Sequence, residues 1–409
     1  MITTKRLLWI GLSLVALVVL WIVVGNFAAG WREAAVARRW AEVSGRRGSL
    51  AEAYHASPMN QSAEVLEDLA AKLGIEVGPL DAPNRPKPAE AEQAQLREMH
   101  TELNRFVRAQ LERPTLQLDP PPAKVSEYLA AHESGLAAMR AQVLGHEPPR
   151  WEMDLSRTVN APIPNVNGEL GLHHILACDT LNKARQGSYA EALEDLEASW
   201  RIGSSVRERP EPLSQLMALQ TATLQAGLLR RMRAAPPMWQ QRLREHNYRK
   251  SFLVSFEADA WVISEYARQE GRPPFGGVVG GIPRVLFKPY FRLACSNYSD
   301  RMSRAAAELS QRDVCPFDSA GFEQRFGGPL PKWTLLSQLE MWSISQAWSR
   351  VRRLLMDLEL TEKILRVRQL QTESKQKTWP REIPGIETSI CSEAHWVYRV
   401  APDEIRRDA

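Results

Sequence analysis

Cysteine is scarce in this sequence, with 4 cysteines among 409 residues. A content so low excludes a small domain held together by dense disulfide bonds. An excess of charge of one sign is also missing, because 52 lysines and arginines face 48 acidic residues and leave a net charge of +4. A protein that binds nucleic acid through its overall charge is therefore excluded, and no nucleic-acid partner is expected.

Catalytic and ligand-binding motifs are missing as well. There is no Cys-x-x-Cys, no His-Glu-x-x-His, no Gly-x-Ser-x-Gly and no phosphate-binding Gly-x-x-x-x-Gly-Lys-Ser/Thr. His174 and Cys178 share one helix face and Asp179 follows, but zinc needs more converging ligands than these. The glycine-rich stretch 276–281 lacks the Lys-Ser/Thr that a phosphate loop carries. The sequence therefore predicts no catalytic residue, no cofactor and no metal.

Long apolar runs are absent except for one at the N-terminus. Residues 7–25 carry no charge, and about 20 apolar residues in a helix cross a hydrocarbon core. The span is expected to contact the lipid bilayer, with tryptophans near its two ends. A cleaved signal peptide is the alternative, although the run exceeds the usual length of its apolar region. The residues that mark the expected span are Leu7, Trp9, Leu20, Trp21 and Val24.

Basic residues gather beside this run. Residues 1–50 hold 7 lysines and arginines against 2 glutamates, so the other residues carry a slight negative charge in total. The positive-inside rule is ambiguous here, since two of these basic residues precede the run and the others come after it. The short basic tail before the run favours export of the chain beyond the run. The expected location is a bacterial inner membrane, crossed once, with the body on the extracytoplasmic side.

The rest of the chain is expected to be mainly α-helical, since its long segments show no convincing alternation with a period of two. Prolines and glycines divide it into helices, with breaks at Gly187, Pro210, Pro212 and Pro236. The expected fold is an N-terminal transmembrane helix, then an irregular body of α-hairpins or a helical bundle, with a small β element at the C-terminus. The expected parts are an anchor (1–30), a helical stalk and linker region (31–150), a hairpin body (151–376) and a small extended segment (377–409).

Large apolar side chains mix with basic ones in residues 282–292, directly after four glycines. This composition suits a membrane interface or a groove for a partner. Leu286, Phe287 and Phe291 are the expected contacts. The alternative is a buried segment that crosses between helices.

A helix-packing seam is predicted in residues 331–376. Its large side chains recur every three or four residues, at Ile344, Trp348, Val351, Leu355 and Leu358. The segment after it contains the run His-Trp-Val-Tyr-Arg-Val, which alternates and is rich in β-prone residues.

The remaining carboxylates and cysteines leave some alternatives open. Glu257 and Asp259 point to nearly opposite sides of one helix and do not form a catalytic pair, and with Glu265 they are expected on a solvated face. An exported body would allow a disulfide between Cys295 and Cys315 or one between Cys315 and Cys391. The sequence does not choose among the three ways in which the four cysteines can pair.

One hairpin, residues 173–204, shows a more specific pattern: Gly187, Tyr189, Ala192, Leu196 and Ser199. This run resembles the second half of a tetratricopeptide repeat, in which small residues let two helices approach closely. The first half departs from that pattern, and no second copy is found. The long helix with its Trp-Pro and Trp-x-Tyr ending resembles the tail of single-pass bacterial envelope proteins.

These features together predict a membrane-anchored helical envelope protein that binds other proteins or acts as a scaffold. One alternative is an envelope enzyme whose active-site residues are dispersed along the chain. The other is a structural component of a secretion or pilus-like machine, which the helix-then-strand ending suggests.

Overall fold

The computed structural model describes residues 4–46, 50–54, 56–79, 85–113, 115–233, 235–270, 284–315, 317–328, 344–374, 379–380, 383, 388–391 and 395–399. The secondary structure elements in these ranges are all helical. They are α1 (Thr4–Ser44), α2 (Leu50–Ala53), α3 (Gln61–Lys72), α4 (Glu90–Glu112), α5 (Ala123–Ala131), α6 (Glu133–Gly145), the 3₁₀ helix η1 (Leu155–Asn160), α7 (Val166–Gln186), α8 (Tyr189–Arg207), α9 (Pro212–Arg231), α10 (Met238–Glu245), α11 (Tyr248–Glu270), α12 (Arg284–Gln311), α13 (Ser319–Phe326) and α14 (Ile344–Glu373).

Local sequence sets many of these helix ends. The side chains of Asn60 and Asn165 cap α3 and α7 by accepting hydrogen bonds from backbone N–H groups of the first turn. Gly187 ends α7 with a φ of 87°, a left-handed conformation that glycine adopts without strain. Pro212 opens α9, where a missing backbone N–H costs nothing. The breaks predicted at Gly187 and Pro212 are therefore confirmed.

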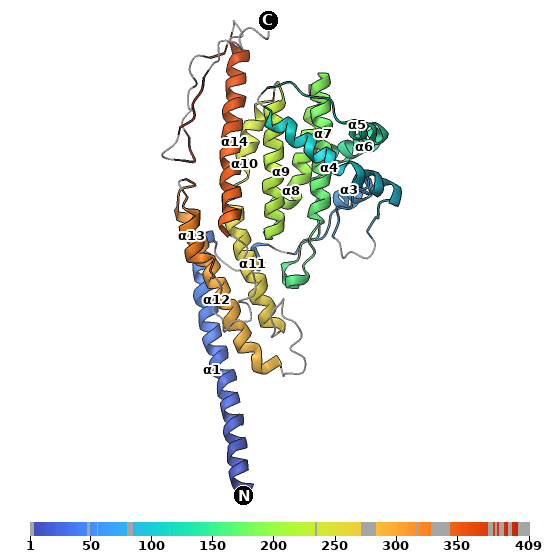
Figure 1. Cartoon of the computed structure of the whole chain (residues 1–409). Helices are drawn as coiled ribbons and strands as arrows, with labels where there is room; N and C mark the ends of the chain where they lie inside the picture. The colour runs from blue at the N-terminus through green and yellow to red at the C-terminus, as the bar shows by residue number, and fades with distance from the viewer. Residues whose placement is uncertain are drawn as a thin grey trace.

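The helices form an elongated molecule (Figure 1). The second half of α1 lies against α12, while the first half projects alone beyond the rest of the described chain. Successive contacts join Trp21 to Leu286, Glu33 to Arg292 and Trp40 to Ser299, so α1 and α12 run parallel. Helix α11 runs in the opposite direction and packs on both, which gives a three-helix base.

The helices α3 to α9 pack beyond this base, on the side away from the N-terminus, and α14 runs along α9 (Figure 1). One hydrophobic core joins the two regions, because buried side chains from α1, α4, α8, α12 and α14 belong to a single cluster. The structure does not divide at residues 30 or 150, where the sequence suggests boundaries. Helix α1 passes residue 30 without a break, and α4 and α6 pack directly on α7 and α8, so residues 90–145 are part of the body and not a stalk.

The C-terminal region confirms the predicted helix-packing seam and leaves the predicted β element without support. Ile344, Trp348, Val351 and Leu358 are buried along α14 and Leu355 packs against the core, as the seam predicts. The described residues of the segment 377–409 contain no strand, and a single parallel bridge joins Cys391 to Cys315.

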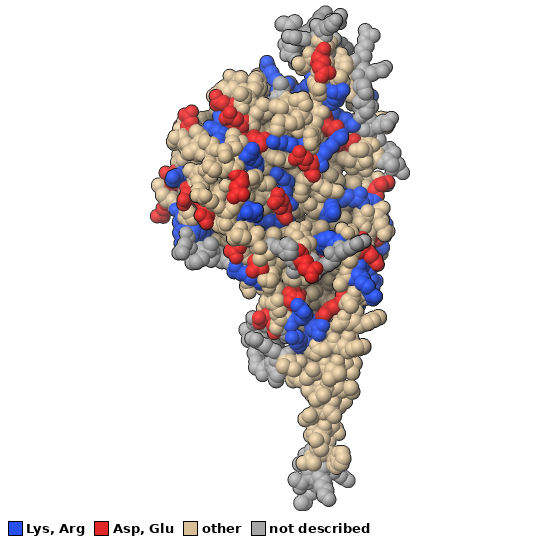
Figure 2. Space-filling view, turned by 180° about the vertical axis from the view of Figure 1, so that it is seen from behind, with Lys and Arg blue, Asp and Glu red and all other residues tan. Residues whose placement is uncertain are grey.

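Charged side chains of both signs are interspersed over the body on the face shown in Figure 2. The projecting part of α1 on the same face is free of them in the described residues, in keeping with the uncharged run 7–25. The surface therefore changes character abruptly where α1 leaves the body.

Candidate membrane-proximal site

The projecting half of α1 exposes a continuous apolar surface. Its large apolar side chains between Leu8 and Val24, apart from Ile22, are 38–70% exposed. The helix is long and apolar enough to cross a membrane. The expected span residues Trp9, Leu20, Trp21 and Val24 all lie on this surface, and Leu7 belongs to the same helix.

Small residues in α1 let α12 approach closely just above this surface. A side chain at Gly25 would collide with Pro289, since an added Cβ would stand 2.7 Å from the Cβ of that proline. Ala29, one turn later, is fully buried. Below them the indole N–H of Trp21 donates a hydrogen bond of 2.9 Å to the carbonyl oxygen of Leu286. The first turn of α12 therefore lies beside the last turns of the apolar surface.

The expected contact residues of α12 separate into two groups. Leu286 and Phe287 are partly exposed, but Phe291 is buried in the core at 3% exposure, so its expected role as a membrane or partner contact is wrong. The ring of Phe291 packs against Tyr290 and Phe287 instead. The exposed apolar residue of this turn is Val285, at 61%. The glycine stretch 276–281 lies outside the described residues.

Ion pairs replace apolar contacts higher on the α1–α12 interface. Arg292 donates to both carboxylate oxygens of Glu33 and, at 2.9 Å, to the amide oxygen of Asn26. Two turns above, Arg39 pairs with Asp300. These ion pairs join α1 to α12 where α1 enters the body. The second half of α1 is therefore an integral helix of the three-helix base.

A groove of about 310 Å³ opens between α1, α11 and α12, and we call it the base groove. Its walls combine two tryptophans, several serines and charged residues. They are Glu33, Val36, Ala37, Trp40, Ala41, Leu50, Glu257, Trp261, Ser264, Glu265, Arg268, Ser296 and Ser299.

The carboxylates of α11 do not lie on a solvated face, contrary to expectation. Glu257 is buried and forms an ion pair with Arg46 just beyond the end of α1. Burial raises the pKa of Glu257 to about 6, although Arg46 opposes the shift. Asp259 accepts a hydrogen bond from the hydroxyl of Tyr298 on the other side of the helix, so it does not pair with Glu257. Burial raises the pKa of Asp259 too.

Glu265 and Arg268 form the lower end of the groove, nearer the apolar surface of α1. The guanidinium of Arg268 donates two hydrogen bonds of 2.7 and 2.8 Å to the carboxylate of Glu265. Burial works to raise the pKa of Glu265, but the hydrogen bonds from Arg268 and Gln269 outweigh it and leave that pKa lowered. Glu265 therefore stays ionised, and the groove presents fixed charges of both signs.

A second polar cluster holds the hairpin of α7 and α8 to α6. The guanidinium of Arg140 bonds to Asp179 at 3.0 Å and to Asp195 at 2.9 Å. The ammonium of Lys183 reaches the same two carboxylates at 2.8 and 2.7 Å. Two cations thus neutralise two buried anions, which fits a structural role in aligning three helices.

A serine–histidine pair lies in the same hairpin, and no sequence motif signals it. The Nδ1 atom of His173 is 2.9 Å from Oγ of Ser199, which also accepts a hydrogen bond from Gln225. Neither residue is accessible, at 0% and 1% exposure. Burial lowers the pKa of His173 to about 3, so the ring is neutral. The pair has no path to a substrate, and no acid orients the ring, because Nε2 of His173 is buried without a hydrogen-bond partner.

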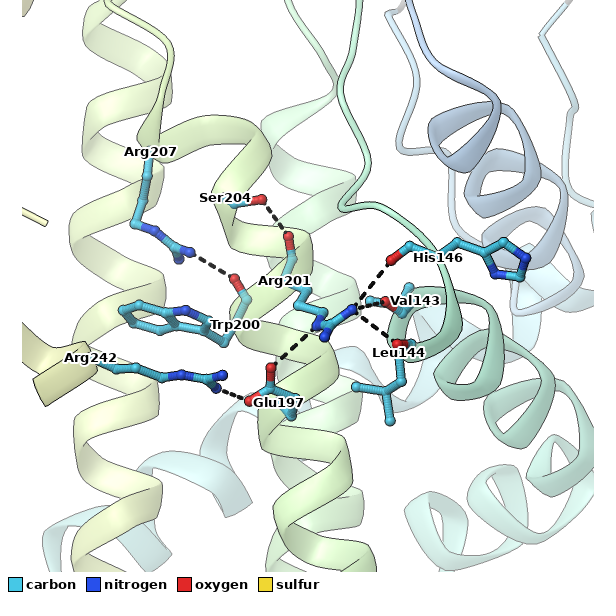
Figure 3. A network of polar contacts seen from close by, with 9 residues as sticks. All are labelled: Val143, Leu144, His146, Glu197, Trp200, Arg201, Ser204, Arg207 and Arg242. Carbon is cyan, nitrogen blue, oxygen red and sulfur yellow. Dashed lines mark hydrogen bonds and ion pairs between the residues drawn. The ribbon is translucent and has the colours of Figure 1, made fainter. Parts of the chain in front are cut away.

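Arginines and tryptophans form a network on α8 and α10 (Figure 3). Arg201 donates to the carbonyl oxygens of Val143, Leu144 and His146, at the end of α6, where carbonyls lack partners within the helix. Its other partner, Glu197, also pairs with Arg242. Arg207 and Arg242 lie over Trp200 and Trp239, whose rings meet edge to face. The network therefore joins α6, α8 and α10, which indicates a structural role.

The cysteines follow one of the two pairings that the sequence left open. Cys315 forms a disulfide with Cys391 across 76 residues. Cys295 is a free, buried thiol, so the expected pairing of Cys295 with Cys315 is wrong. The disulfide ties the C-terminal segment to the residues that come after α12.

Within the described ranges, no group of three or more histidine, cysteine or acidic side chains is arranged to hold a metal ion. Comparison of the chain with family models, with curated proteins and with solved structures finds no match. Proposals about function therefore rest on the geometry alone.

Proposed function

We propose that this chain is a single-pass membrane protein of the bacterial envelope whose helical body is seated on the membrane surface and binds other proteins there. The observation that carries the proposal is the exposed apolar half of α1, which is continuous with a half that packs on α12 and places Val36 and Trp40 in the core. Exposing so much apolar surface to water is unfavourable, and a bilayer removes that cost.

The start of α12 extends this proposal. If residues 7–25 span the bilayer, Trp21 lies about 6 Å inside its edge, because a helix rises 1.5 Å per residue. Leu286, bonded to Trp21, and the exposed Val285 then lie at the same depth. The body accordingly rests on the bilayer through two helices, which fixes its height and tilt.

The disulfide supports the extracytoplasmic side for the body. Bonds of this kind persist in oxidising compartments and are rare in the cytosol. A body held on that side presents α8, α9 and α10 away from the bilayer, and exposed apolar residues such as Leu213 and Met238 are available to a protein partner.

Membrane seating is tested with two matched variants of the full-length protein, each of which adds one exposed cysteine while the native disulfide and the two buried thiols are kept. Val285→Cys and Val397→Cys replace valines of nearly equal exposure, 61% and 63%, in the base and in the C-terminal segment. A fluorophore at position 285 should be quenched by brominated lipids in proteoliposomes, and one at position 397 should not. Equal quenching at both positions, or release of the protein by carbonate, would contradict the proposal.

Orientation and partner binding need separate measurements. Protease added to cells with a permeable outer layer should digest the body, and complete protection would reverse the orientation. A photo-crosslinking residue at Leu213 should give protein adducts of discrete size in cells, whereas one at Leu14 should give lipid adducts. Absence of any protein adduct from the body positions would contradict the scaffold role.

A further inference from the structure

A further cavity lies between the second half of α14 and the described residues of the C-terminal segment, and we call it the tail pocket. Its volume is about 350 Å³, which falls in the range of small-molecule sites. This half of α14 lies at the end of the molecule away from the N-terminus (Figure 1). Most of the wall is apolar, and its aliphatic and aromatic side chains include Leu360, Ile364, Val367, Trp379, Trp396 and Tyr398.

Polar contacts hold the C-terminal segment against α14 next to this pocket. The two carboxylate oxygens of Glu359 accept hydrogen bonds of 2.8 Å, one from the hydroxyl of Thr388 and one from the backbone N–H of Ser389. The disulfide of Cys391 with Cys315 follows directly in the chain. The two walls of the pocket are therefore tied together by specific bonds.

The described lining of the tail pocket contains three cations and no acidic residue. Lys363 has Glu359 at 3.8 Å, but that carboxylate also accepts the bonds from the C-terminal segment. Arg368 donates to carbonyl oxygens at the end of α9, which carry no net charge. Arg399 is exposed and forms no ion pair with a described residue. The pocket therefore favours an anion.

Two hydrogen-bond donors at the same wall lack partners. The indole nitrogen of Trp396 and the hydroxyl of Tyr398 are shielded from water, and neither has a hydrogen-bond partner. A shielded donor without an acceptor is unfavourable. Both side chains are half-buried at the wall, so a small rotation of either ring brings its donor to an oxygen in the pocket.

We infer that the tail pocket binds a small organic acid, with its apolar body between α14 and the tryptophans and its carboxylate at Arg399. A guanidinium fork matches the two oxygens of a carboxylate, and the donors of Trp396 and Tyr398 add further bonds to them. One guanidinium without an ion-pair partner balances a single negative charge, which fits a monocarboxylate better than a dianionic phosphate. The site does not depend on the membrane seating, because no residue of α1 or α12 lines it.

The test measures binding of phenylbutyrate to the full-length protein in detergent by calorimetry, and the same titration into detergent alone is subtracted. Phenylbutyramide has the same shape without the charge. The wild type should bind the acid about fivefold more tightly than the amide, the size expected for one exposed ion pair. Arg399→Gln should lose that preference and keep its affinity for the amide. Trp396→Phe should weaken binding of both compounds, because the ring stays and the donor is lost.

Arg366→Gln is the matched control, because Arg366 is an exposed arginine of α14 that bonds to Gln369 and lies outside the pocket lining. It should keep the wild-type preference for the acid. Both arginine variants should keep the wild-type thermal midpoint, since both side chains are exposed. Equal affinity of the wild type for acid and amide, the absence of saturable binding of the acid, or the same loss in both arginine variants overturns the inference.

Discussion

The indole nitrogen of Trp21 lies 2.9 Å from the backbone carbonyl oxygen of Leu286, although 265 residues separate them in the chain. A carbonyl in the first turn of a helix normally accepts from the N–H four residues later. The bond to Trp21 adds a donor from α1, and so ties the start of α12 to the anchor.

Trp21→Phe should loosen this junction without affecting membrane insertion. The phenyl ring keeps most of the apolar area but removes the N–H, which costs about 1 kcal/mol. Hydrogen exchange should therefore speed up at the start of α12 in proteoliposomes, while flotation is unchanged. Trp9→Phe is the control, since Trp9 lies on the exposed surface far from α12. Equal effects of the two variants would show that the bond to Leu286 is irrelevant.

Arg201 donates hydrogen bonds to three carbonyl oxygens at the end of α6, and a second prediction follows from these bonds. Arg201→Ala leaves the end of α6 without these donors and should lower the free energy of unfolding by about 2–3 kcal/mol. Arg201→Lys should recover little, because one ammonium does not reproduce the planar fork that also reaches Glu197. Urea titration in detergent gives the values.

Arg185→Ala supplies the comparison for Arg201. Arg185 lies exposed near the end of α7 and bonds only locally among the contacts described, to Asn182. Its removal should change the free energy of unfolding by less than about 0.5 kcal/mol. A loss similar to that of Arg201→Ala would mean that the cap on α6 contributes nothing specific.

Much of the fold could be predicted because its signals are local. Proline and glycine end helices through their own backbone geometry, and the seam of α14 repeats within one helix. The apolar run 7–25 needs no partner to be recognised.

The base groove could not be predicted, because its contacts join distant segments. Considered on α11 alone, Glu257 is expected to be solvated, whereas in the fold it is buried and forms an ion pair with Arg46, which lies just beyond the end of α1. Contacts with distant segments also determine that Val285 is exposed and Phe291 is buried. Both are apolar residues of one helix, and the face that α1 and α11 cover decides which is buried.

The disulfide between Cys315 and Cys391 should contribute substantially to stability. Closing a loop of 76 residues reduces the entropy of the unfolded chain, which corresponds to about 4 kcal/mol. Cys391→Ser, or reduction of the wild type, should therefore lower the thermal midpoint. A thermal midpoint that reductant does not change would contradict the pairing of Cys315 with Cys391.

The free thiol of Cys295 should resist alkylation in the folded protein, because burial raises its pKa to about 12.

Glu169 provides a pH-dependent prediction. It is fully buried, accepts hydrogen bonds from Trp151 and Ser205, and has one carboxylate oxygen without a partner. Burial raises its pKa from 4.5 to about 7. Between these two values the folded protein binds more protons than the unfolded chain, so its contribution to stability is complete below pH 4.5 and is lost as pH rises to about 7.

Glu169→Gln should remove that dependence. The uncharged amide has nothing to ionise, so the free energy of unfolding of the variant relative to the wild type should rise by about 2–3 kcal/mol between pH 4.5 and pH 7.5. Urea titrations at a series of pH values measure the difference, and Glu191→Gln, an exposed residue of α8, is the control. Because other groups titrate equally in both proteins, only Glu169 contributes to the difference. A difference that stays constant over this range would mean that Glu169 is ionised throughout, held by Arg209 nearby, and that its burial is compensated.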